Sequence, residues 1–129
     1  MGWITLSPKA YRWWQNFTAT HYRANGYTVD FISHSAVRYR AGERSITFSS
    51  EPLDRAFGSG KSNWVLAVYV HRPLTWDEPH PSEITDPAEE NAILSRVQTA
   101  LKSKIGKYEL IAHPEWKRNA FQRQVLNCR

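Results

Sequence analysis

Three side chains in the middle of the chain are of types that bind metals or transfer protons: His71, Asp77 and His80. Zinc sites show short, regular spacings between ligands, and these three residues match none of them. Cys128 is the single cysteine, so a Cys-based zinc site and an internal disulfide framework are both excluded. We therefore expect no metal and no cofactor. If the chain were an enzyme, His71 or His80 would be the attractive acid–base residues.

A second candidate is the segment Gly58-Ser-Gly60-Lys61-Ser62, which looks like the end of a phosphate-binding loop. The full motif requires a glycine five residues before Gly60, and Arg55 occupies that position. It also requires a helix afterwards, whereas residues 64–70 have the composition of a strand. No Ser/His/Asp arrangement and no pair of carboxylates at one strand end stands out either. The sequence predicts a protein that is not an enzyme.

The region from Asp77 to Glu90 contains six acidic residues and no lysine or arginine. Trp76 precedes it, and Pro79 and Pro81 restrict the backbone to extended forms. A tryptophan on a stiff surface loop either anchors the loop to the core or contacts a partner. Our candidates for protein binding in this region are Trp76, Asp77, Glu78, His80 and Glu83.

Basic residues form the alternative candidate surface. Arg38, Arg40 and Arg44 fall in a predicted strand meander, and Lys117 and Arg118 fall in the C-terminal segment. Arginines on one sheet face can hold phosphates or carboxylates, although antiparallel sheets also commonly leave one face in water. The net charge is +5 and the pI is about 9.6. A small nucleic-acid-binding domain is therefore the alternative function.

The elements that would position these residues make one α+β domain. The length of 129 residues is typical of a single domain. Ser7-Pro8 predicts the start of a helix that continues past His21 and stops at Asn25-Gly26. Alternating apolar residues then predict an antiparallel meander of three strands, the last covering Ser45 to Ser49.

The second half of the chain supplies the centre of the predicted sheet and its covering helix. Residues 64–70 are nearly continuously apolar, which predicts a central strand followed by an elbow at residues 76–82. Asp86-Pro87 predicts a capped helix near residues 87–103, and a strand follows at about residues 107–111. We expect a sheet of about five strands with two packed helices, in a domain of residues 1–113. Residues 114–129 are expected to be a basic helix or tail.

Location follows from what the sequence lacks. No apolar run approaches 18 residues, so we expect no membrane span. The N-terminus has no basic region before its short apolar run, unlike a secretory signal. The absence of a disulfide framework fits a reducing compartment. We expect a cytoplasmic protein.

One resemblance narrows the function. It is carried by residues 39–51, Tyr-Arg-Ala-Gly-Glu-Arg-Ser-Ile-Thr-Phe-Ser-Ser-Glu, by residues 76–80, Trp-Asp-Glu-Pro-His, and by the acidic capped helix that follows. With Gly106 and a last short strand, residues 36–111 resemble a family of small predicted bacterial immunity proteins that accompany polymorphic toxins, including contact-dependent inhibition systems. The resemblance implies a non-catalytic protein that binds and blocks a co-produced toxin. On this basis we expect the acidic elbow to occlude a basic groove, with its carboxylates in place of phosphates. A positive net charge departs from the acidic character common among nuclease inhibitors.

Overall fold

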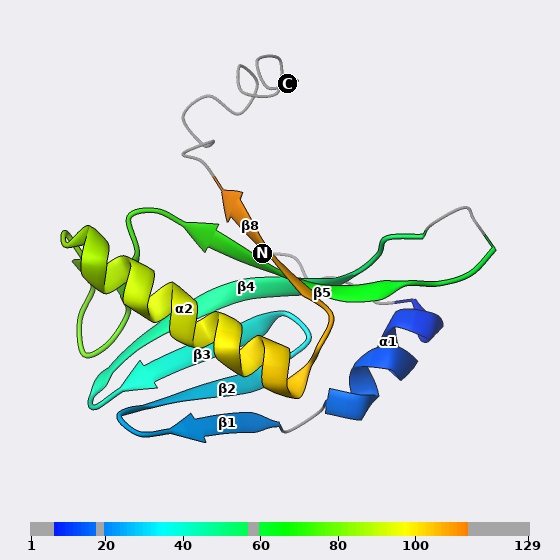
Figure 1. Ribbon diagram of the computed structural model, residues 1–129, viewed down its shortest axis with the longest axis horizontal. Helices are drawn as coiled ribbons and strands as arrows, with labels where there is room; N and C mark the ends of the chain where they lie inside the picture. Colours follow the sequence, from blue (N-terminus) through cyan, green and yellow to red (C-terminus); the bar gives the residue numbers. More distant parts are fainter. Residues whose placement is uncertain (1–6, 18–19, 57–59, 114–129) are drawn as a thin grey trace, which may run out of the picture.

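The computed structural model describes residues 7–17, 20–56 and 60–113, and the structural statements below concern these residues. Its centre is a six-stranded sheet in the order β1-β2-β3-β4-β5-β8, in which only the β5–β8 pair is parallel (Figure 1). The elements are α1 (Pro8–Trp14), a 3₁₀ turn (Gln15–Phe17), β1 (His21–Ala24), β2 (Tyr27–Ser33), β3 (Ala36–Ala41), β4 (Arg44–Asp54), β5 (Trp64–His71), β6 (Thr75–Trp76), β7 (Ser82–Glu83), α2 (Pro87–Lys104) and β8 (Tyr108–His113). The predicted α+β class with two helices is confirmed.

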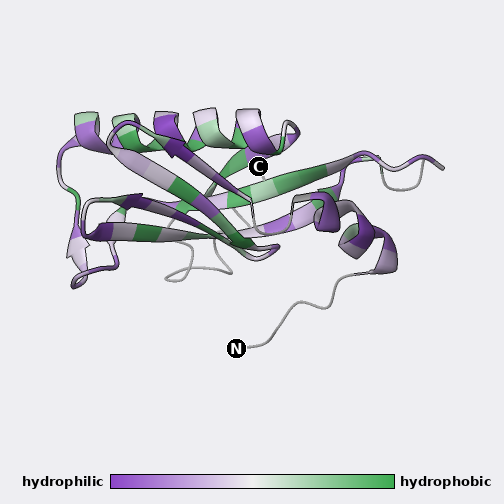
Figure 2. Cartoon of the chain, turned by 90° about the horizontal axis from the view of Figure 1, so that it is seen from below, coloured by the Kyte–Doolittle hydropathy of each residue, from purple (hydrophilic) through white to green (hydrophobic). Residues whose placement is uncertain are grey.

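Helix α2 is the crossover between the two parallel strands, β5 and β8. Asp86 caps it, because its Oδ1 accepts a hydrogen bond from the Ala88 backbone N–H at 3.0 Å. The buried residues of α2 recur every three or four positions, and they are Ile93, Val97, Ala100 and Leu101. Figure 2 shows α2 running across one face of the sheet. This helix matches its sequence prediction to within one residue at its end.

The sheet buries one face under α2, and β5 is buried on both faces. In β2 and β3 every second side chain is buried, including Val29, Phe31, Val37 and Tyr39. In β5 four consecutive residues, 65–68, are buried, so both faces of this strand are covered there. The prediction of a central strand at residues 64–70 is confirmed.

The N-terminal region differs from its prediction. The helix ends at Trp14, and residues 21–24 form strand β1 instead of a continued helix. Asn25-Gly26 is the turn of a β1–β2 hairpin, in which Gly26 has a φ of 92°. An Asn-Gly pair between strand residues is a strong hairpin signal because both positions tolerate positive φ. The sheet therefore gains the strand that the five-strand prediction lacked.

Strand β4 is also longer than predicted. It continues from Ser49 to Asp54, through residues assigned to a loop from sequence, and includes Pro52. β5 pairs with this added half of β4 from Ser49 to Asp54. The predicted segment 114–129 lies outside the described residues. Among those described, no helix is both long enough and apolar enough to cross a membrane.

Candidate functional site

The acidic elbow, which we define as residues 76–83, takes the place of β5 beside the first half of β4. β5 stops pairing with β4 at Ser49. Towards the start of β4, the elbow runs along the same edge. There the Asp77 N–H donates to the Ser45 carbonyl oxygen at 2.7 Å, and the Ser45 N–H donates to the Glu78 carbonyl oxygen at 3.3 Å. The elbow is therefore attached to the sheet by its backbone.

Two carboxylates of the elbow also hold it to β4. The Thr47 N–H donates to Asp77 Oδ2 at 2.7 Å, and Ser45 Oγ donates to Glu78 Oε1 at 3.2 Å. A hydrogen bond to a charged acceptor is stronger than a neutral one. Both side chains are nevertheless exposed to solvent. Asp77 and Glu78 thus present charge at the surface while their positions are fixed by β4.

The far side of the elbow is closed by a short ladder and by α2. β6 and β7 pair through Thr75 with Glu83 and through Trp76 with Ser82. The Leu74 N–H donates to Glu90 Oε2 at 2.6 Å, which ties the chain before the elbow to the first turn of the helix. Glu83 and His80 are exposed, and Glu83 shows no side-chain hydrogen bond within the described part of the chain. The elbow is a braced surface segment.

Trp76 is buried, so it is not an exposed contact residue. Only 4% of its surface is accessible, its ring centre lies 6.2 Å from that of Tyr39, and the Arg44 guanidinium carbon lies 4.4 Å from its ring centroid. Of the two roles that the sequence left open, the structure shows the core anchor. The reason is register: Trp76 and Tyr39 both lie on the α2 side, where they complete the core.

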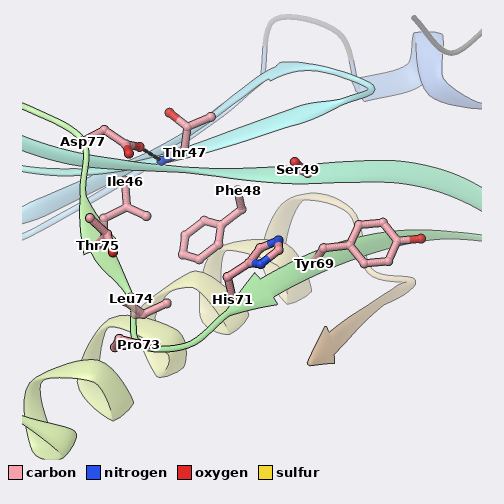
Figure 3. Close-up of a pocket in the computed structure, with 10 residues that line it drawn as sticks. All are labelled: Ile46, Thr47, Phe48, Ser49, Tyr69, His71, Pro73, Leu74, Thr75 and Asp77. Atoms are coloured by element: carbon pink, nitrogen blue, oxygen red, sulfur yellow. Dashed lines mark hydrogen bonds between the residues drawn. The ribbon is translucent and has the colours of Figure 1, made fainter. Parts of the chain in front are cut away.

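A cavity of about 170 Å³ opens where β5 and the elbow separate along β4 (Figure 3). Ile46, Phe48 and Leu74 supply apolar walls, and Asp77 and His71 line it as well. Figure 3 shows the Thr47 backbone bonded to Asp77 beside this opening. The cavity exists because no strand fills this short stretch between β4 and the end of β5. Asp77 is the one residue of the acidic elbow among those that line it.

The histidines do not make a metal site with the elbow. His71 lines the cavity together with Asp77, whereas His80 is exposed on the elbow and does not line it. Within residues 7–17, 20–56 and 60–113, no three His, Cys, Asp or Glu side chains are grouped closely enough to hold a metal ion. The side chains at the cavity offer surfaces for binding.

The basic candidates are divided between two sides of the sheet. Arg38 pairs with Thr47 and Arg40 with Ser45, on the face opposite α2. Arg44 lies over Trp76 on the α2 side, so the expectation that it shares a face with the other two is wrong. Side chains alternate between the two faces along each strand, and the β3–β4 turn sets which face each residue of β4 takes. Arg44 follows Arg40 by four positions and Arg38 by six, but the turn between them places it on the other face.

The face that keeps Arg38 and Arg40 is mixed in charge. Asp30 stands opposite Arg38 in the β2–β3 ladder, and both are half-buried. Lys117 and Arg118, the remaining members of the basic candidate surface, lie outside the described residues. The structure therefore brings two of the five basic candidates together.

No protein-family model, no curated protein and no solved structure matches this chain. The sequence singled out Asp77, Glu78 and Glu83 as candidates, because a run of acids beside prolines is visible in the sequence itself. The sequence did not predict the cavity or the hydrogen bond that Glu90 accepts from Leu74. Both depend on the pairing between β4 and β5 stopping at Ser49.

Proposed function

We propose that this chain is an immunity protein, which binds a cognate toxin domain through the acidic elbow and blocks its active or substrate-binding site. The observation that carries the proposal is the attachment of exposed carboxylates to β4. Asp77 and Glu78 accept hydrogen bonds from Thr47 and Ser45 while remaining exposed. The resemblance of residues 36–111 to immunity proteins supports the same function.

Preorganisation is the physical reason to favour this surface. A segment already held in its bound shape loses little conformational entropy on docking. The elbow is braced by the β6–β7 ladder, by backbone bonds to Ser45 and by the Leu74–Glu90 bond nearby. Its acids lie in a stretch without lysine or arginine, so their fields add. A basic partner surface would meet it quickly and in a defined orientation.

The alternative, nucleic-acid binding, has weaker support in the same geometry. Nucleic-acid affinity rises with the number of phosphates that a protein neutralises. Arg23, Arg38 and Arg40 share the face opposite α2, but Asp30 stands opposite Arg38 on that face and Glu51 lies on it as well. A continuous basic track is therefore not built by the described residues.

The test removes the charges while preserving the bonds. In the triple variant Asp77→Asn, Glu78→Gln, Glu83→Gln, the amide oxygens at positions 77 and 78 can still accept the hydrogen bonds that the carboxylates accept. The partner to test is a toxin domain encoded next to this gene, which the proposal requires. Calorimetry with stopped-flow rates should show binding weaker by about 2 kcal/mol, roughly thirtyfold in Kd, with much of the loss in the association rate.

The matched control is Ser95→Lys, Gln98→Lys, Ser103→Lys, which places the charges on exposed positions of α2. Both triple variants change the formal net charge from +5 by three, to +8. A control that loses as much affinity as the amide variant would mean that total charge matters and that the elbow is not the contact. Tight binding of a single-stranded oligonucleotide by the wild type, retained at physiological salt, would favour the nucleic-acid alternative.

A further inference from the structure

A groove of about 270 Å³ lies between α2 and the β3–β4 hairpin, on the α2 side of the sheet. Apolar side chains form its walls, chiefly Trp76, Ala92 and Ile93. Arg44 comes from the hairpin side and Arg96 from the helix side. Two cations from different elements thus face one partly apolar space. No pattern in the sequence links Arg44 to Arg96.

Each guanidinium is oriented by an aromatic ring. The Arg44 guanidinium carbon lies 4.4 Å from the Trp76 ring centroid, and that of Arg96 lies 5.4 Å from the Tyr27 ring centroid. Stacking on a ring face leaves the N–H groups at the edge of the guanidinium plane directed outward. Neither arginine is ion-paired with a carboxylate of the described residues. The groove therefore presents oriented donors whose charges have no bound counterion within that part of the chain.

Tyr39 holds Arg96 in place from beneath the groove. Its side chain is fully buried, and its hydroxyl oxygen accepts a hydrogen bond from Arg96 Nη1 at 2.8 Å. A fully buried hydroxyl has no surface for a ligand to contact, so Tyr39 acts by fixing the position of the Arg96 guanidinium.

We propose that this groove binds a carboxylate, held by Arg44 and Arg96, with Tyr39 positioning the Arg96 guanidinium. The charge balance favours a singly charged ligand, because Glu89 also lines the groove and leaves a net charge of +1. A planar carboxylate matches the fork of a guanidinium, and apolar walls accommodate a carbon chain or ring beside it. The carboxylate belongs either to a free organic acid or to an acidic side chain of a protein.

The experiment titrates the ¹⁵N-labelled full chain and follows the Nε–H signals of Arg44 and Arg96 by NMR. Benzoate represents a free acid, a capped Gly-Glu-Gly peptide represents a protein side chain, and benzyl alcohol is the neutral control. Benzoate is expected to bind saturably with a Kd on the order of 1 mM, as is usual for a ligand of this size. Benzyl alcohol should cause no saturable shift.

Variants identify the donors. Arg44→Gln and Arg96→Gln should each weaken benzoate binding by about tenfold, the value of a charge-assisted hydrogen bond. Tyr39→Phe should weaken it by about threefold or more. The matched control is Arg40→Gln, on the opposite face, which should bind as the wild type does. The two arginine variants are independent, so one that does not fold leaves the other as the test.

The outcomes separate the possibilities. Saturable binding of both acids supports a site that accepts a protein side chain, and binding of benzoate alone supports a site for a free acid. Absence of saturation, or wild-type affinity for benzoate in both Arg44→Gln and Arg96→Gln, overturns the proposal. Tighter binding of inorganic phosphate than of benzoate overturns the assignment to a carboxylate.

Discussion

The two halves of β4 are held along the same edge by different means. From Ser49 to Asp54 the strand pairs residue by residue with β5. From Ser45 to Phe48 it meets the acidic elbow, through backbone bonds at Ser45 and through the carboxylate of Asp77 at Thr47. The half from Ser49 to Asp54, which we call the ladder half, continues the sheet into β5, and the half from Ser45 to Phe48, the elbow half, borders the 170 Å³ cavity.

This difference shows where the fold and the proposed function share residues. In a regular ladder a backbone N–H donates to a backbone carbonyl oxygen, so the surface side chains can change without loss of the bond. At Thr47 the acceptor is a side chain, and its loss would leave a backbone donor without that partner. The acids of the elbow therefore serve both the structure and the charged surface.

The largest expected loss of stability is in the ladder half, where β4 pairs with β5. Leu66 is fully buried in β5, opposite Pro52. We expect Leu66→Ala to lower the free energy of unfolding by about 3 kcal/mol, because it creates a cavity in a closely packed core. The matched substitution is Leu74→Ala, at a side chain that is 2% exposed but already borders the open cavity. It should cost less, about 2 kcal/mol, at the low end of such substitutions.

Urea denaturation of both variants measures this contrast. The slope of the unfolding free energy against urea should be unchanged, so that the midpoints report stability directly. Equal losses of unfolding free energy in the two variants would mean that the elbow half of β4 is packed as tightly as the ladder half.

A smaller effect is expected at Asp77. Asp77→Ala removes the acceptor for the Thr47 N–H and should cost about 1 kcal/mol. Asp77→Asn keeps an oxygen acceptor and should cost clearly less. Hydrogen exchange of the Thr47 amide gives the local readout, since its protection should fall in the alanine variant and be largely kept in the asparagine variant. If both substitutions leave that protection unchanged, the carboxylate does not hold the elbow.

The sequence predicted the parts of this molecule that depend on local patterns. Asp86-Pro87 predicted where α2 begins, and the apolar stripe at Ile93 and Val97 predicted its buried face. Caps and helical periodicity can be predicted because they are properties of neighbouring residues. The β1 strand was missed, since Trp14 and His21 happen to fit a helical spacing that the Asn-Gly turn overrides.

The candidate site was predictable only as a list of acids. Burial of Trp76 and exposure of its neighbour Asp77 follow from the alternation of side chains along the elbow edge of β4, and that edge exists because β5 stops pairing at Ser49. Where one strand ends relative to another is a tertiary property. The same holds for Arg44 and Arg96, which are far apart in sequence and meet across a groove.

The smallest expected effect concerns alkaline pH and tests the ladder half alone. Tyr69 donates a hydrogen bond from its hydroxyl to Glu51 Oε2, on the face opposite α2. Burial, with the Glu51 hydrogen bond as a second cause, raises the pKa of Tyr69 to about 12. An unfolded chain would have a tyrosine pKa of about 10. Because the folded value is the higher one, this contribution to stability is complete below about pH 10 and is lost as the pH rises towards about 12.

Urea midpoints measured across that range should therefore decline less steeply in Tyr69→Phe than in the wild type. Some decline should remain, since burial also raises the pKa of Tyr27. Glu51→Gln keeps an acceptor but removes the charge, so it should fall between the two. A Tyr69→Phe protein whose midpoint falls as steeply as the wild type would show that this tyrosine does not link the ladder half of β4 to alkaline stability.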